Sequence, residues 1–313
     1  MEHGLEAPFP TGSQGEATVS IRAVTPDKEP WKLPPLGHGI PPPVLEHRDT
    51  VVDGVRWHSR EAPGVGVPIL YVHGHLASSA TWEDVLVAAS AGHPAIAVDV
   101  PGFGASDRPW PHDYSVLGEA RSLLAYLDAR GIERAILVGN SLGGAAALLV
   151  AADHPDRVAA LVLAAPATPE APIAWQVKLM RLPVLGEVAL ALANRLLAAH
   201  GLRSWLFARA DRVTPRVVDD AWKPMTIRGT RRAALAAIRS DRRAHAGLER
   251  RIRVPTLIVW GAEDRLIPAS GAPRVQANIA GSRLVVIPDA GHLPQREQPE
   301  AFASTVAKFV ARF

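Results

Sequence analysis

The 313-residue chain has no cysteine, few aromatic residues and no long uninterrupted hydrophobic run. Without cysteine, disulfides, thiolate metal sites and a cysteine nucleophile are excluded. The richest apolar segment, residues 184–199, is broken by Glu187, Asn194 and Arg195 and is too short for a bilayer span of about 20 apolar residues. The first residues are acidic and lack the apolar core of a signal peptide. We therefore expect a soluble cytoplasmic protein without a membrane partner.

The net charge of the chain is also small. The formal net charge is +3, although arginine is concentrated between Arg228 and Arg253. A nucleic-acid site would usually add stacking aromatic residues or a recognition motif to such a stretch, and neither accompanies it. We interpret the stretch as a solvated helix surface and expect no nucleic-acid partner.

What the chain does contain is an alternation of short apolar runs and longer amphipathic stretches. Runs that are apolar on nearly every residue are typical of parallel strands covered by helices on both faces. The predicted strands are residues 68–72, 95–98, 135–138, 158–164, 256–260 and 284–287. A hairpin over residues 47–60, turning at Asp53-Gly54, precedes them. The predicted fold class is α/β, with a doubly wound, mostly parallel sheet and an inserted helical cap.

Two segments depart from this alternation. Residues 1–45 are rich in Pro and Gly and predict an extended N-terminal arm. Residues 168–232 are mainly helical in pattern and separate two strands, which predicts a cap domain with a hydrophobic pocket. Residues 46–167 and 233–313 then form the core.

A candidate nucleophile follows the strand over residues 135–138. The sequence there is Gly139-Asn140-Ser141-Leu142-Gly143, and a helix is predicted to begin at once. A serine on a sharp strand-to-helix turn needs very small neighbours, and two glycines supply them. This setting predicts Ser141 as a nucleophile, with the backbone N–H of Leu142 at a helix N-terminus where it can stabilise a negative oxygen.

A serine nucleophile requires a base and an acid that orients it. His292 is the one histidine after the strand over residues 256–260, and it lies in a loop just past the last strand. Asp264 follows the preceding strand, at the edge where catalytic groups gather in such sheets. Glu263 and Asp289 remain alternatives for the acid.

The second donor for the negative oxygen is expected in the loop after the first parallel strand, in the run His73-Gly74-His75-Leu76. The backbone N–H of His75 is the candidate, paired with that of Leu142. Two histidines with one residue between them and no third ligand nearby do not predict a metal site. We expect neither a metal nor a cofactor.

These motifs resemble those of the α/β-hydrolase superfamily from about Glu46 to the C-terminus. The resemblance also covers the run Asp99-Val100-Pro101-Gly102-Phe103-Gly104-Ala105-Ser106-Asp107 and the ending Gly291-His292-Leu293-Pro294-Gln295-Arg296-Glu297-Gln298-Pro299-Glu300. It implies the α/β-hydrolase fold and the triad Ser141, Asp264 and His292. A serine at position 141 differs from the aspartate that the resemblance implies for haloalkane dehalogenases and epoxide hydrolases.

Asn140 and Gly144 look like residues of the carbon–carbon hydrolases that cleave meta-ring-fission products. In those enzymes an aromatic residue commonly follows the catalytic histidine and a cap arginine contacts the substrate carboxylate. Here Leu293 and Arg296 stand after the histidine. The residues proposed to line the pocket are Asn140, Trp175, Trp205 and Leu293, and Arg181 and Arg209 are candidates for binding a carboxylate.

The sequence favours a serine hydrolase that cleaves a carboxylic ester, or a related acyl bond, of a small apolar substrate through an acyl-enzyme. Carbon–carbon bond hydrolysis and cofactor-free perhydrolysis use the same triad and remain alternatives. A non-catalytic receptor for a small ligand on the same scaffold is an alternative of another class.

Overall fold

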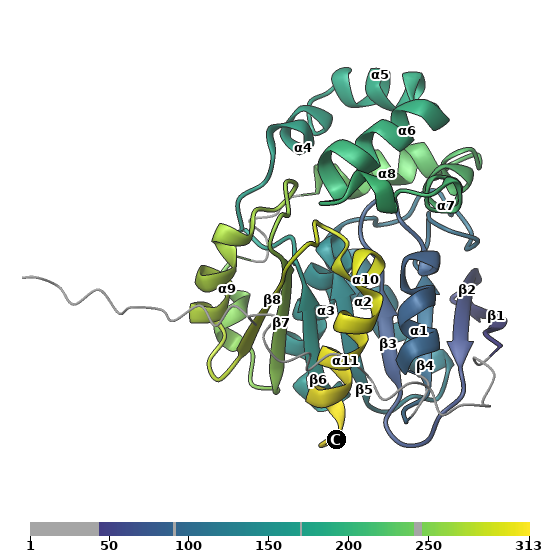
Figure 1. Cartoon of the computed structure of the whole chain (residues 1–313). Coiled ribbons are helices and arrows are strands. Elements are labelled where there is room, and N and C mark those ends of the chain that lie inside the picture. The colour runs from purple at the N-terminus through teal and green to yellow at the C-terminus, as the bar shows by residue number, and fades with distance from the viewer. Residues whose placement is uncertain (1–43, 90–91, 170, 241–245) are drawn as a thin grey trace, which may run out of the picture.

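The computed structural model describes residues 44–89, 92–169, 171–240 and 246–313. Its centre is an eight-stranded sheet in the order β1-β2-β4-β3-β5-β6-β7-β8 (Figure 1). The strands are β1 Glu46–Val52, β2 Val55–Ala62, β3 Ile69–Val72, β4 Ala95–Asp99, β5 Ala135–Asn140, β6 Val158–Ala164, β7 Thr256–Gly261 and β8 Arg283–Ile287. The sheet is parallel from β4 to β8, and β2 pairs antiparallel with both β1 and β4. The predicted fold class is thus confirmed.

The first two strands form the predicted hairpin. Val52 pairs with Val55, and the two residues between them, Asp53 and Gly54, both have positive φ. That conformation belongs to the tight turns whose twist matches the twist of paired strands. Of the segment predicted as an extended arm, residues 1–43 lie outside the described residues, and residues 44 and 45 lead directly into β1.

Each face of the sheet has its own core because successive side chains of a buried strand point to opposite faces. In β3, Leu70 and Val72 join one cluster, whereas Ile69 and Tyr71 join the other. The first cluster includes residues of α2 (Val116–Ala129), α3 (Ser141–Asp153) and α9 (Ala272–Asn278). The second includes residues of α1 (Glu83–Ala89) and α11 (Pro299–Val310). Strands that are apolar on every residue are therefore buried from both sides.

A helical insertion between β6 and β7 lies over the carboxyl ends of the parallel strands (Figure 1). Its helices are α4 Trp175–Met180, α5 Leu185–Leu192, α6 Arg195–Gly201, α7 Pro215–Met225 and α8 Thr230–Arg239, and a π-helical turn, Leu202–Leu206, extends α6. The last helix continues past residue 232, where the sequence pattern placed the end of the cap. No helix among the described residues is long and apolar enough to cross a membrane.

One carboxyl oxygen beside the first core cluster lacks a polar partner. Oε1 of Glu119, in α2, is buried and has no hydrogen-bond partner among the described residues. Burial raises the pKa of Glu119 from 4.5 to about 8. Its folded-state pKa is higher than its unfolded value, so its contribution to stability is complete below the unfolded pKa and is lost as the pH rises toward the folded pKa.

We expect Glu119→Gln, which keeps a neutral side chain of the same shape, to remove this loss. Between about pH 5 and pH 8 the unfolding free energy of the wild type should fall relative to that of the variant, measured by urea denaturation. Glu133→Gln changes an exposed carboxylate and should follow the wild type. Parallel pH profiles for the wild type and Glu119→Gln would show that the Glu119 carboxyl is already ionised in the folded protein.

Candidate active site

The strand-to-helix turn at Ser141 is sharp and strained. β5 ends at Asn140 and α3 begins at Ser141, whose φ is +54°. A left-handed backbone is uncommon for a residue with a side chain and costs roughly 1–3 kcal/mol. The serine is nevertheless held there, 7% exposed. It follows β5 at the carboxyl end of the parallel strands, the end over which the helical insertion lies (Figure 1).

Two glycines make this turn possible because other atoms occupy the space of their missing side chains. A Cβ at Gly139 would lie 2.4 Å from the carbonyl oxygen of Gly143. A Cβ at Gly143 would lie 2.3 Å from the carbonyl oxygen of His73, in the loop after β3. Contacts below 3 Å with backbone atoms require the backbone itself to move. The turn, the sheet and the neighbouring loop therefore share one close-packed arrangement.

Asp264 and His292 form a buried pair at the same edge of the sheet. Oδ2 of Asp264 lies 2.8 Å from Nδ1 of His292, and the two residues are only 5% and 3% exposed. Oδ1 of Asp264 accepts hydrogen bonds from the backbone N–H groups of Leu266 and Ile267, both at 2.8 Å. With Oδ1 held by the backbone, Oδ2 is directed at the imidazole. This arrangement favours the tautomer in which Nδ1 carries the proton and Nε2 is free to accept one.

The two alternative acids lie elsewhere. Glu263 is exposed and accepts a hydrogen bond from the backbone N–H of Ala290 at 3.1 Å. Asp289 is also exposed, and its carbonyl accepts from Arg212 at 2.8 Å. The structure therefore places Asp264 against His292. Among the described residues the carboxylates of Glu263 and Asp289 form no hydrogen bond with the imidazole.

Hydrogen bonds from three directions hold the loop that carries His292. Nδ2 of Asn140 donates to the carbonyl of His292 at 3.2 Å and to that of Ala164 at 3.0 Å. The backbone N–H of His292 donates to the carbonyl of Leu206 in the helical insertion at 2.7 Å. The Glu297 carboxylate accepts from Gly291 at 2.6 Å and from the insertion backbone as well. The base is thus anchored to the sheet and to the insertion together.

The loop after β3 lies directly against the serine. A Cβ on Gly74 would be 2.9 Å from Cβ of Ser141, which leaves room only for glycine. The Gly74 carbonyl accepts from the Ala77 N–H at 3.3 Å and lies 2.8 Å from Nδ1 of His73. These bonds fix the path of the loop through His75, beside the start of α3.

The His73 and His75 side chains have structural partners. Nε2 of His73 accepts from the N–H of Val100 at 3.2 Å. Nε2 of His75 donates to the carbonyl of Ala234 in α8 at 2.8 Å, and burial lowers the pKa of His75 to about 4. Both bonds suit neutral imidazoles. Among the described residues no group of three His, Asp or Glu side chains is arranged to hold a metal ion.

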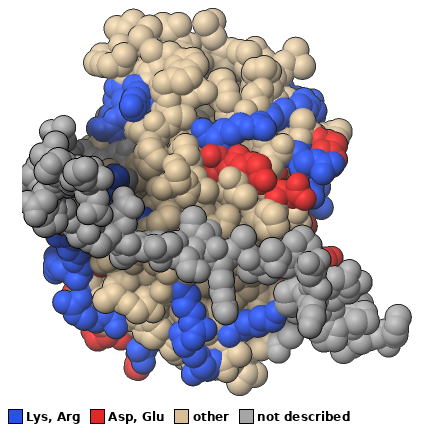
Figure 2. Space-filling view, turned by 60° about the vertical axis from the view of Figure 1, so that its left-hand side comes forward, with Lys and Arg blue, Asp and Glu red and all other residues tan. Residues whose placement is uncertain are grey.

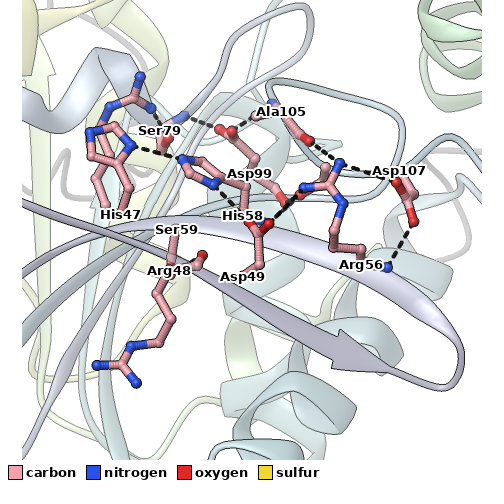
Figure 3. Close-up of polar contacts among 12 residues, drawn as sticks. His47, Arg48, Asp49, Arg56, His58, Ser59, Ser79, Asp99, Ala105 and Asp107 are labelled. Atoms are coloured by element: carbon pink, nitrogen blue, oxygen red, sulfur yellow. Dashed lines mark hydrogen bonds and ion pairs between the residues drawn. The ribbon is translucent and has the colours of Figure 1, made fainter.

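The Asp-x-Pro-Gly segment after β4 is held by the side chain that opens it. Figure 3 shows the Asp99 carboxylate accepting from the N–H groups of Ser79, at 2.6 Å, and Ala105, at 2.7 Å. The Asp99 carbonyl accepts from the Ser106 hydroxyl at 2.5 Å. A Cβ on Gly104 would fall 2.0 Å from Cγ of Asp99. The motif therefore builds a loop under the insertion.

The residues predicted to line the pocket lie in different surroundings. Asn140 is buried, and its amide is committed to two backbone carbonyls. Leu293 is buried in a small cluster with residues of the insertion. Trp175 is 66% exposed at the start of α4, and Trp205 is 36% exposed in the π-helical turn. Neither tryptophan is buried as the lining of a closed pocket would be.

The two arginines that were candidates for a carboxylate ligand have partners within the chain. Arg181 donates to the carbonyls of Ile238 and Ser240 at 2.7 and 3.0 Å. Arg209 pairs with Asp211 at 3.1 Å on the surface.

Arg296 and Glu297 were part of the ending motif but received no role from the sequence. Arg296 has a side chain only 5% exposed, donates to the carbonyl of Ala80 at 2.7 Å and pairs with Asp220 of α7. The carboxylate of Glu297 joins the histidine loop to Ala208 at 2.7 Å. Adjacent charged residues after the histidine were the available signal, but their partners lie far away in the sequence.

Known proteins are similar to this chain in sequence and in fold. Residues 67–299 match the family model described as the alpha/beta hydrolase fold. A pimeloyl-[acyl-carrier protein] methyl ester esterase of Neisseria meningitidis is 30% identical over 257 residues, covering 80% of this chain and 95% of the relative. A 2-hydroxy-6-oxononadienedioate/2-hydroxy-6-oxononatrienedioate hydrolase of Comamonas testosteroni is 28% identical over 278 residues, covering 82% and 91%.

Among solved structures, Cfl2 from Burkholderia cenocepacia superposes with a TM-score of 0.77 at 26% identity, covering 85% of this chain and 95% of that one. The family model's range, residues 67–299, includes strands β3 to β8, the serine turn and the histidine loop. The chain belongs to the alpha/beta hydrolase fold family.

The glycine geometry at the turn predicts a severe effect of Gly143→Ala. The added methyl group would meet two backbone carbonyls that belong to β3 and its loop, so we expect a loss of about 3 kcal/mol in unfolding free energy, measured by urea denaturation. Gly92→Ala is the matched control, because no atom of the described residues lies within 4 Å of its Cβ position, and it should change stability by less than about 0.5 kcal/mol. Equal stabilities of the two variants would contradict the close packing described here.

Proposed function

We propose that the chain is a serine hydrolase that cleaves a carboxylic ester, or a related acyl bond, of a largely apolar substrate. Membership of the alpha/beta hydrolase fold family supports hydrolase activity, and so do the activities for which its two relatives are named. The observation that carries the proposal is the buried Asp264–His292 pair at 2.8 Å, at the sheet edge where Ser141 occupies its strained turn.

The proposed reaction follows from these positions. The Ser141 hydroxyl attacks the substrate carbonyl carbon while Nε2 of His292 takes the hydroxyl proton, and Asp264 stabilises the imidazolium that forms. The backbone N–H groups of His75 and Leu142 stabilise the negative carbonyl oxygen. Collapse of this intermediate expels the alcohol, which receives the proton from His292 and leaves an acyl-enzyme. A water molecule, deprotonated by His292, then releases the acid and restores the serine.

The structure bears differently on the alternatives. Carbon–carbon bond hydrolysis has support from the Comamonas relative. However, the Asn140 amide is committed to backbone carbonyls, and both candidate carboxylate-binding arginines have partners within the chain. These contacts favour an ester over a substrate that carries a carboxylate. In this proposal the helical insertion acts as the cap over the site, and no cofactor takes part.

A fluorophosphonate probe tests this function because it labels only an activated serine. We expect one adduct per chain by intact mass, together with turnover of 4-nitrophenyl esters of increasing chain length. Ser141→Ala should carry no adduct and lose at least about 10⁴-fold in kcat. His292→Ala is the informative control, since it keeps the serine but removes its base and should also escape labelling.

Adduct formation without ester turnover would contradict an ester substrate and would favour carbon–carbon bond hydrolysis or perhydrolysis at the same serine. Folded wild-type protein that takes up no probe would overturn the hydrolase proposal and favour the small-ligand receptor.

A further inference from the structure

The outer face of the helical insertion is unusually apolar. Of the 17 large hydrophobic side chains that are exposed among the described residues, ten lie between residues 175 and 205. They are Trp175, Leu179, Leu182, Val184, Leu185, Val188, Leu192, Leu196, Leu197 and Trp205. Scattered exposed hydrophobic residues are ordinary, but their concentration in one helical insertion is typical of an interaction surface. We call these ten residues the outer apolar face.

The helices of the outer apolar face already bury other apolar residues on their inner sides. In α5, Leu190 is 5% exposed and packs against the first core cluster, whereas Leu192 is 66% exposed. In α6, Ala199 is buried in the insertion's own cluster, while Leu196 is 78% exposed. A helix that faces only water would place polar residues on its outer side. Here the outer side is apolar as well.

Positive charge predominates on the helical insertion. Residues 171–240 contain twelve Lys and Arg side chains against four Asp and Glu side chains. Arg195, Arg209 and Arg239 pair with three of these carboxylates, at 2.7, 3.1 and 2.6 Å, and most of the other basic side chains remain in excess. Figure 2 shows the top of the molecule as a broad uncharged surface, with Lys and Arg at its margins and a group of Asp and Glu directly below them.

A groove of about 520 Å³ borders this face between α5 and α8. Its lining includes Arg231, Arg232 and Arg239, against the single carboxylate of Glu187. Arg232 lies over the ring of Trp110 at 4.0 Å. The helical insertion that carries the outer apolar face, and the groove at its border, therefore have a net positive charge.

We propose that the outer apolar face docks on the surface of an anionic lipid bilayer. Segments that lie in a membrane interface combine Leu and Trp on one side with Lys and Arg around it, and their affinity has both an apolar and an electrostatic part. Indole rings prefer the headgroup level, which suits the exposed Trp175 and Trp205. The helices α4 to α6, at six to eight residues each, lie on the bilayer rather than span it.

Charge distinguishes a bilayer from a second copy of this chain. Two outer apolar faces brought together would oppose their basic residues, and the chain carries a net charge of +3. Anionic headgroups supply the complementary charge. The sequence alone predicted no membrane partner because it has no apolar segment long enough to span a bilayer, and interfacial docking needs none.

Docking would present the insertion, and the site beneath it, to esters dissolved in the bilayer. Access of such esters to the site rests on the proposed function, whereas docking itself does not. If the chain is the proposed hydrolase, its substrates are long-chain acyl esters that partition into membranes.

Vesicle flotation of the full chain tests the docking. We expect the protein to float with vesicles that contain phosphatidylglycerol, to float less with pure phosphatidylcholine, and to be released by salt. Leu185→Glu/Leu192→Glu should weaken binding at least about ten-fold, because each leucine loses its favourable burial and gains a charge of the wrong sign. Val51→Glu/Leu117→Glu is the matched control: Val51 and Leu192 are both 66% exposed, and Leu117 and Leu185 are 40% and 46% exposed.

Wild-type protein that does not float, or equal losses in the two double variants, would overturn the proposal. A concentration-dependent dimer that Leu185→Glu/Leu192→Glu makes monomeric, without vesicle binding, would assign the face to a second copy and would also overturn it.

Hydrolysis separates the two proposals. The Leu185→Glu/Leu192→Glu variant should keep the turnover of a soluble short-chain ester and lose that of a long-chain ester embedded in vesicles. Loss of both activities would point to a damaged active site. Flotation of wild-type protein that cleaves neither ester would leave the docking intact and contradict the hydrolase function alone.

Discussion

The left-handed turn at Ser141 is the constraint to which the rest of the site is fitted. The chain passes from β5 into α3 within one residue, which is possible only because Gly139 and Gly143 omit atoms that would meet backbone. The strain persists because both flanks are held firmly: every residue of β5 is buried, and most of α3 is too. A doubly covered parallel sheet can hold a conformation that an exposed loop would relax.

The histidine is positioned by a different physical means. Its loop has little regular structure, so its order comes from hydrogen bonds with Asn140, Leu206 and Glu297. Two of these connections involve the helical insertion, since the Leu206 carbonyl belongs to it and Glu297 also binds the Ala208 N–H. A displacement of the insertion would therefore shift the base relative to the sheet. The geometry of the site and the placement of the insertion are coupled through a few backbone bonds.

The sequence predicted the strands closely because buried parallel strands are apolar throughout, and it predicted the serine turn because glycine has few substitutes there. It could not predict contacts that depend on assembly. Asn140 and the carbonyl of His292 are 152 residues apart, so the anchoring role of Asn140 is invisible in a local motif. Arg296 and Asp220 illustrate the same limit. The sequence also could not predict which apolar side chains of the insertion are exposed. Trp175 has the large aromatic side chain expected of a pocket residue, but it is largely exposed to solvent.

The two sides of the insertion differ in chemistry. Its core side combines apolar packing, for example by Leu190 and Ala234, with polar contacts. Arg216 of α7 pairs with Glu83 at 2.7 Å, Arg296 reaches Asp220, and His75 bonds to α8. Exposed ion pairs contribute little, about 0–1 kcal/mol each, but Arg296 is almost fully buried and its partners fix direction. Hydrogen bonds and ion pairs on the inner side orient the insertion, whereas the aliphatic side chains of the outer apolar face have no polar groups that could form such bonds. That division leaves the outer side free to gain its stabilisation from a surface that is itself apolar and negatively charged.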